Sequence, residues 1–156
     1  MGVRIVVDGL DHPECVTVDR KGNLYCGGES GQLYALSDSD SSANVISTRG
    51  GLILGVCVNG NGTIYACDAS GKELYARKPD GELSVISRGS ADRVMQIPNF
   101  PVLDEQGNIY VSDSGSWPEG GGCVFKISPD GETTIWSEAA PHFTNGLALN
   151  PAGTFL

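Results

Sequence analysis

Short apolar runs that alternate with turn residues recur along the whole chain. A phrase made of a turn glycine and a strand occurs four times, as KGNLYCGG, NGTIYACD, QGNIYVSD and AGTFL. Its glycines, Gly22, Gly62, Gly107 and Gly153, are spaced 40, 45 and 46 residues apart. The runs are rich in β-branched or aromatic residues and bounded by Gly, Asn, Asp or Pro, which is typical of β-strands. No segment shows the periodicity of a helix.

Three further strands keep their place around each of the first three phrases, and the fourth phrase has the preceding one. One strand precedes the phrase (CVTVD, GVCVN, FPVLD or GLALN), and two follow it, the last of them NVISTR, LSVISR or TTIWSE. Four antiparallel strands in a unit of about 40–50 residues predict a blade of a β-propeller. We therefore predict an all-β fold, with blades at about residues 13–48, 52–88 and 98–138 and the start of a fourth at about 144–156.

The two ends of the chain predict an open ring. Residues 3–9 (VRIVVDG) resemble the outer strand that closes many propellers by completing the last blade. Three blades and part of a fourth leave an inter-blade face and a strand edge exposed, whereas propellers close their ring. We expect the chain to be a fragment of a longer protein. The alternative is self-association of two copies through the open edge into a ring of about six blades.

Charge and composition exclude several function classes. The net charge of −9 and the pI near 4.5 argue against nucleic acid or an anionic membrane as a partner. No apolar run approaches 18 residues, and the first residues are not expected to form a signal peptide because acidic residues come early in them. The five cysteines form no CxxC pair, so we interpret them as reduced core residues of a cytoplasmic protein. The acidic run at residues 37–42 lacks the spacing of an EF-hand and is interpreted as a solvated hairpin loop.

The position eight residues before each turn glycine carries candidate chemistry. It is occupied by Glu14, Leu54, Asn99 and Asn145. The innermost strand of each blade lines the central channel, so these side chains are expected to converge. One carboxylate and two amide oxygens suit Ca²⁺ best and Mg²⁺ or Mn²⁺ less well. They do not suit structural zinc, which prefers Cys and His, although Zn²⁺ stays a possible cofactor. The competing interpretation makes both asparagines turn residues at strand starts and Glu14 a solvated residue on the rim.

The phrases HPECVTVDRKGNLY, IPNFPVLDEQGNIYVSDSG and FTNGLALNPAGTFL resemble the family that groups gluconolactonase, senescence marker protein (regucalcin) and luciferin-regenerating enzyme. The resemblance covers essentially the whole chain and implies a six-bladed propeller with one divalent ion, commonly Ca²⁺, in its channel. It implies Glu14 and Asn145 as metal ligands and Asn99 as a metal ligand or substrate contact. The Asp that serves this family as ligand and general base is expected beyond Leu156.

The implied function is metal-dependent hydrolysis of a small-molecule lactone or related ester, and this fragment alone is expected to be nearly inactive. An Arg-x-Asn-Asp phrase found in lactonases of the family is not matched, because Phe100 follows Asn99. The candidate substrate-binding residues are Asn99, Arg93, Asp113, Ser114 and His142, with Trp117 as a candidate lid residue. A non-catalytic calcium-binding or interaction propeller and a strictosidine-synthase-like propeller stay open as alternatives.

Overall fold

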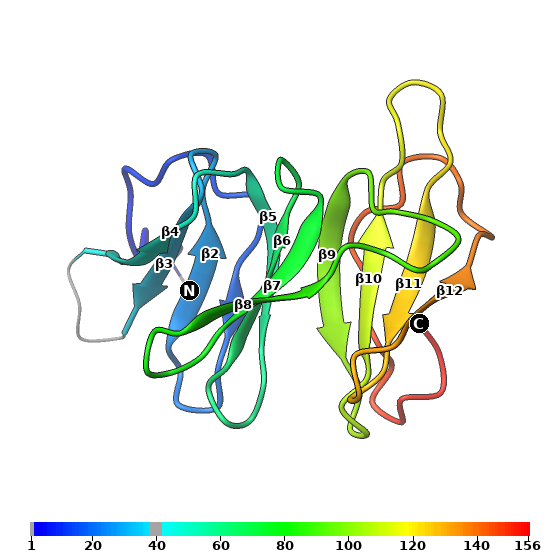
Figure 1. Ribbon diagram of the computed structural model, residues 1–156. Coiled ribbons are helices and arrows are strands. Elements are labelled where there is room, and N and C mark those ends of the chain that lie inside the picture. The colour runs from blue at the N-terminus through cyan, green and yellow to red at the C-terminus, as the bar shows by residue number, and fades with distance from the viewer. Residues whose placement is uncertain (1, 38–41) are drawn as a thin grey trace.

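The computed structural model describes residues 2–37 and 42–156, which contain strands and no helix (Figure 1). The first sheet, β1-β2-β3-β4, comprises Thr17–Val18, Leu24–Gly27, Gln32–Leu36 and Asn44–Thr48. The second, β5-β6-β7-β8, comprises Ile53–Val58, Ile64–Asp68, Glu73–Arg77 and Leu83–Ser87. The third, β9-β10-β11-β12, comprises Pro98–Leu103, Ile109–Asp113, Cys123–Ile127 and Thr133–Ser137. The predicted all-β class is confirmed.

The first hairpin of each sheet repeats the same register and the same turn. Tyr25, Tyr65 and Tyr110 of the repeated phrase each face the residue eight positions earlier on the preceding strand. Three residues before each turn glycine, a side-chain oxygen of Asp19, Asn59 or Asp104 accepts two backbone N–H groups of the turn at 2.8–3.0 Å. The glycines have φ of 83–88°, which a residue with a side chain rarely adopts. The repeat in the sequence is thus a repeat of turn geometry.

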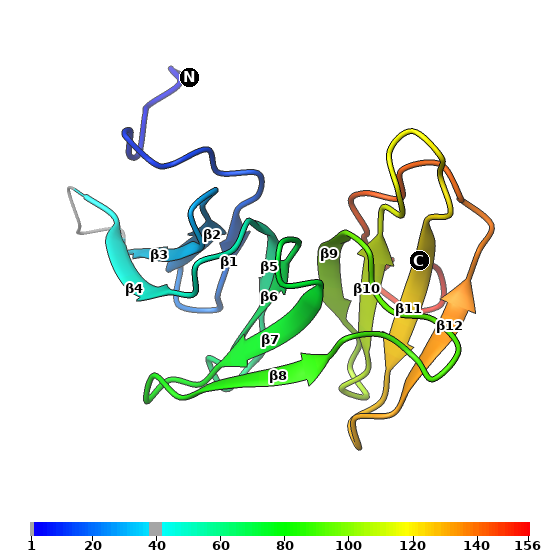
Figure 2. The same cartoon turned by 45° about the horizontal axis from the view of Figure 1, so that its top comes forward.

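Two hydrophobic cores fill the spaces between neighbouring sheets. One joins the first sheet to the second and contains Leu33, Ile53, Val56, Ile64, Ala66 and Tyr75. The other joins the second sheet to the third and contains Cys67, Leu74, Met95, Ile109, Val111, Cys123, Phe125 and Ile127. Because each core takes side chains from two successive sheets, the sheets stand face to face and follow an arc (Figure 2).

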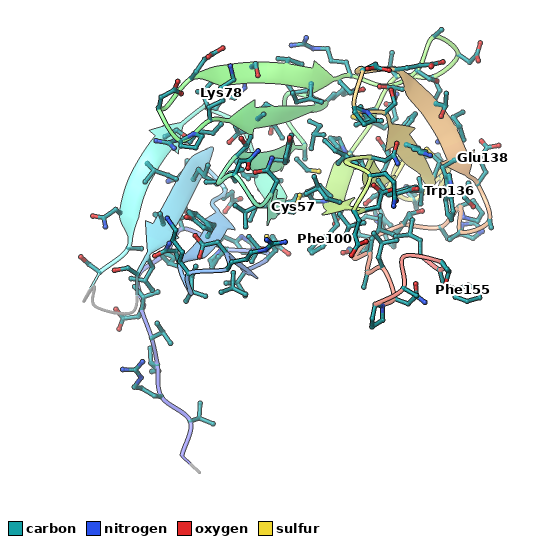
Figure 3. All side chains as sticks on the ribbon, turned by 90° about the horizontal axis from the view of Figure 1, so that it is seen from below. Cys57, Lys78, Phe100, Trp136, Glu138 and Phe155 are labelled. Carbon is teal, nitrogen blue, oxygen red and sulfur yellow. The ribbon has the colours of Figure 1, made fainter. Side chains whose placement is uncertain are left out.

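The first strands of the three sheets lie side by side on the inner side of the arc, where Figure 3 labels Cys57 and Phe100. The Sγ of Cys15 lies 3.2 Å from the backbone nitrogen of Val56. A Cβ on Gly55 would lie only 2.4 Å from the carbonyl oxygen of Asn99, so β5 and β9 are nearly in backbone contact there. These contacts align the three strands at matching levels of the repeat.

The ends of the chain form no strand. Residues 3–9 are mostly exposed and pair with no sheet in the described part of the chain. A closing strand pairs with the outer edge of the last blade of a ring, and the three described sheets do not close a ring. The role of residues 3–9 as a closing strand therefore stays a prediction. Residues 144–149 also lie outside any strand, although the turn around Gly153 is formed, with the Oδ1 of Asn150 accepting two backbone N–H groups. Residues 38–41 of the acidic run lie outside the described residues.

All five cysteines are free, as the sequence predicts. Cys26, Cys67 and Cys123 are buried, and Cys15 and Cys57 are partly buried. Burial raises the pKa of the Cys15 and Cys123 thiols to about 11. In residues 2–37 and 42–156, no helix is long and apolar enough to cross a membrane.

Candidate functional site

A short hydrogen-bond chain links Asn99, Ser114 and Thr144, three residues that are far apart in sequence. The Nδ2 of Asn99 donates to the Oγ of Ser114 at 3.1 Å, and this Oγ donates to the carbonyl oxygen of Thr144 at 2.9 Å. Ser114 is fully buried, and Asn99 and Thr144 are each only 8% exposed. We call this chain of hydrogen bonds the Asn99 relay. It joins the start of β9 to the end of β10 and to the segment that precedes Asn145.

The relay is held in place by the carboxylate of Asp113. Its Oδ2 accepts the backbone N–H of Gln96 at 2.7 Å, and its Oδ1 accepts those of Ile97 at 3.2 Å and Gly115 at 2.8 Å. The backbone N–H of Ser114 also donates to the carbonyl of Ile97 at 2.9 Å. Asp113 is fully buried, so its oxygens serve the backbone and position Asn99. The sequence points to Asp113 as a substrate contact and does not reveal this structural use.

Glu14 lies in a different environment, on the exposed rim before β1. Its carboxylate is 3.2 Å from the Nε2 of His12, and the Nδ1 of the same ring is 3.2 Å from Glu29. The side chain of Glu14 is 48% exposed. It also lines an apolar hollow of about 360 Å³ together with Leu10, Pro13 and Cys15. His12 was not among the residues singled out from the sequence, although it stands two positions before Glu14.

Asn145 and His142 lie beside the insertion of the third blade, which spans residues 115–122. Asn145 is exposed and directly follows Thr144 of the relay. The insertion is fastened to this segment, because the backbone N–H of Gly122 donates to Pro141 at 2.7 Å. His142 is exposed, and its ring lies close to Gly120.

Trp117 and Arg93 each contact a residue from another segment of the chain. The indole of Trp117 is 74% exposed and meets Phe143 edge to face, with the ring centroids 5.5 Å apart. Arg93 forms an ion pair with Glu138 at 2.9 Å. Its guanidinium therefore links the loop before β9 to the residue that follows β12, and its contact with a substrate stays a prediction.

The structure thus brings Asn99, Ser114 and the segment of Asn145 together through the relay. Glu14 lies before β1 of the first sheet, and β5, which contains Leu54, lies between β1 and β9. In the described part of the chain, no group of three or more His, Cys, Asp or Glu side chains could hold a metal ion. A cation here would depend on amide oxygens in addition to the Glu14 carboxylate.

Solved structures with the same fold cover most of this chain. A candidate gluconolactonase from a structural genomics consortium superposes with a TM-score of 0.80 at 23% identity. A gluconolactonase from Xanthomonas campestris does so with a TM-score of 0.79 at 17% identity. The matches cover 96% and 94% of this chain and 56% and 53% of those chains, so this chain spans about half of their length.

The same fold occurs in proteins with other roles. A chain of the nidogen–laminin complex superposes with a TM-score of 0.76 at 18% identity, over 90% of this chain and 53% of that one. The fold therefore does not decide between an enzyme and a binding module. No curated protein matches the sequence.

The family description SMP-30/Gluconolactonase/LRE-like region matches residues 12–156, which include Glu14, the Asn99 relay and Asn145. With the three blades and the neighbouring gluconolactonase structures, this match confirms both the predicted resemblance and the propeller fold. The chain therefore belongs to the SMP-30/gluconolactonase/LRE-like family.

Proposed function

We propose that this chain is part of a propeller that hydrolyses a lactone or related ester with the help of one divalent cation, Ca²⁺ by preference. Membership of a family that includes gluconolactonases supports a lactonase-type activity. The observation that supports the binding of a cation is the Asn99 relay. It engages the amide nitrogen of Asn99 with Ser114, which leaves the amide oxygen pointing to the opposite side of the planar group.

The donor set fits a hard cation. The Glu14 carboxylate and the amide oxygens of Asn99 and Asn145 are the ligand types that Ca²⁺ prefers, with water completing its coordination. A bound cation would polarise the substrate carbonyl as a Lewis acid and stabilise negative charge on its oxygen. The apolar Leu54 stands at the equivalent level of the second blade and supplies no ligand.

The other residues of the candidate site contact the protein rather than the proposed cation. Asp113 and Ser114 hold Asn99 in one orientation, so that the amide needs no reorganisation when a ligand arrives. The Trp117–Phe143 pair and the insertion stand beside Asn145. We assign no general base among the described residues and propose that this group, an Asp, is supplied by another blade of the propeller.

A non-catalytic interaction propeller is the second candidate, because the nidogen–laminin complex contains the same fold. The two candidates differ in turnover. A catalyst hydrolyses a lactone or ester faster in the presence of its cation, whereas an interaction module binds the cation without turnover.

The proposal is tested by calcium titration in a calorimeter. The chain is expected to bind one Ca²⁺, and Glu14→Gln is expected to abolish binding because it removes the only anionic ligand of the set. Glu29→Gln is the matched control. The carboxylate of Glu29 lies 3.2 Å from the ring of His12, as that of Glu14 does, but Glu29 does not occupy the position eight residues before a turn glycine. Equal binding by both variants, or no binding of Ca²⁺, Mg²⁺ or Mn²⁺ by the folded chain, contradicts the proposed ligand set.

A further inference from the structure

We propose that Ser114 is a positioning residue that fixes the orientation of the side-chain amide of Asn99. By engaging the amide nitrogen, it makes Asn99 present an acceptor, so that this point of the site takes a cation or a hydroxyl donor and disfavours an anion. The choice of a cation as ligand rests on the proposed function, whereas the orientation of the amide rests on the relay alone.

The orientation follows from counting protons. The carbonyl oxygen of Thr144 has no proton, so the hydrogen bond that joins it to Ser114 must use the single hydroxyl proton of Ser114. The Oγ of Ser114 can then only accept from Asn99, and only the Nδ2 of that amide can donate. An inverted amide would set two acceptors face to face in a buried place, where Ser114 is fully shielded from water.

The relay is a special feature of the third blade. The position seven residues after the turn glycine is Glu29 in the first blade, Ala69 in the second and Ser114 in the third. Only the serine combines a hydroxyl proton with an acceptor lone pair, which both partners of the relay require. The hydroxyl also binds the carbonyl next to Asn145, so one side chain ties two of the proposed ligands together.

Ser112 offers a matched control on the same strand. It is fully buried like Ser114, and its Oγ lies 3.0 Å from the backbone nitrogen and 3.4 Å from the carbonyl oxygen of Phe100, the neighbour of Asn99. Ser112→Ala therefore removes a buried hydroxyl at the same depth without touching the amide of Asn99. The two alanine variants are expected to lose similar stability, and Ser114→Thr retains the hydroxyl as the conservative variant.

The first test reads the amide directly by ¹⁵N-resolved NMR of the chain without metal. We expect a side-chain proton of Asn99 that exchanges slowly with water and shows a nuclear Overhauser contact to the β protons of Ser114. Ser114→Ala is expected to lose the slow exchange, whereas Ser112→Ala and Ser114→Thr keep it. Rapid exchange of both Asn99 protons in the unmodified chain, or no difference between the two alanine variants, overturns the proposal.

The second test is calcium affinity by calorimetry. Loss of a residue that orients a ligand weakens metal binding by about 10–100-fold, so this loss is expected for Ser114→Ala and not for Ser112→Ala. Equal affinity of the two variants overturns the role in cation binding. If the unmodified chain binds no cation while the amide resonances behave as expected, the proposed function fails and the positioning of Asn99 stands.

Discussion

The two sides of the candidate site are built differently. On the third blade, Asn99 is buried and its amide is engaged by Ser114, which in turn rests on Thr144. On the first blade, the side chain of Glu14 is half-exposed, and its carboxylate contacts the ring of His12, which is itself exposed on the rim. The third blade thus presents a buried amide with a fixed hydrogen-bond partner, whereas the first presents a half-exposed carboxylate.

The repeat shows where this difference originates. Six residues after the turn glycine, the third blade has Asp113, whose carboxylate accepts three backbone N–H groups around the start of β9. The first blade has Gly28 at that position and cannot make this connection. In the proposed site, the oriented amide oxygen of Asn99 and the half-exposed carboxylate of Glu14 would divide the work, because the charge would attract the cation and the oriented oxygen would position it.

The largest effect is expected from Asp113→Ala. The change leaves three backbone N–H groups without their acceptor in a buried place and should cost about 3–5 kcal/mol of the free energy of unfolding. Urea denaturation measures this loss. Asp11→Ala is the comparison on the first blade, where a partly buried carboxylate accepts the backbone N–H of Ser30 and the side-chain amide of Gln32. A loss as large for Asp11→Ala would remove the contrast between the two blades.

Alkylation of cysteine thiols tests whether the first and third blades differ only at the surface or also in their buried parts. Burial raises the pKa of Cys15, beside Glu14, and of Cys123, in the third blade, to about 11. A thiol with a raised pKa holds less thiolate at pH 8, so both should be alkylated about 100-fold more slowly than a cysteine with a pKa of 9.0. Mass spectrometry of iodoacetamide-treated protein, with unfolded protein as the control, measures the rates. Fast labelling of Cys15 alone would show that the first blade is loose at depth as well.

Gly55→Ala tests the strand between the two sides. A Cβ at this position would lie 2.4 Å from the carbonyl oxygen of Asn99 and 2.7 Å from the Cα of Phe100, and backbone atoms cannot turn aside. We expect a loss of about 1–3 kcal/mol in the free energy of unfolding and weaker calcium binding through displacement of Asn99. Gly60→Ala, whose nearest new neighbour is the Arg20 guanidinium at 3.9 Å, is the control. Equal stability of the two variants would contradict the close packing of β5 on β9.

The smallest effect is expected from His12→Ala. An exposed substitution should change the free energy of unfolding by less than about 0.5 kcal/mol. Calcium affinity should rise about 2–5-fold, because His12 no longer competes for the Glu14 carboxylate. Calorimetry measures this change. Weaker binding in the variant would make His12 a contributor to the cation site rather than a competitor.

Local features of the sequence predicted most of the fold. The turn glycines and the Asp or Asn three residues before them define the hairpins, because these contacts lie within four residues. The register of the repeat also placed Leu54 and Asn99 on adjacent strands, whereas Glu14 lies before the first strand of its sheet. Contacts between distant segments could not be predicted, such as Arg93 with Glu138 or His12 with Glu29. The role of Asp113 was missed for the same reason, since its partners Gln96 and Ile97 lie 16 or more residues away.

The central claim is that the two unlike sides serve one cation. Calcium titration followed by ¹⁵N NMR tests it most directly, with the backbone resonances of Glu14 and the side-chain amide of Asn99 observed together. The account predicts that both sets of signals shift with increasing calcium and saturate along the same curve. Shifts at only one of the two residues, or two curves with different midpoints, would contradict a shared site.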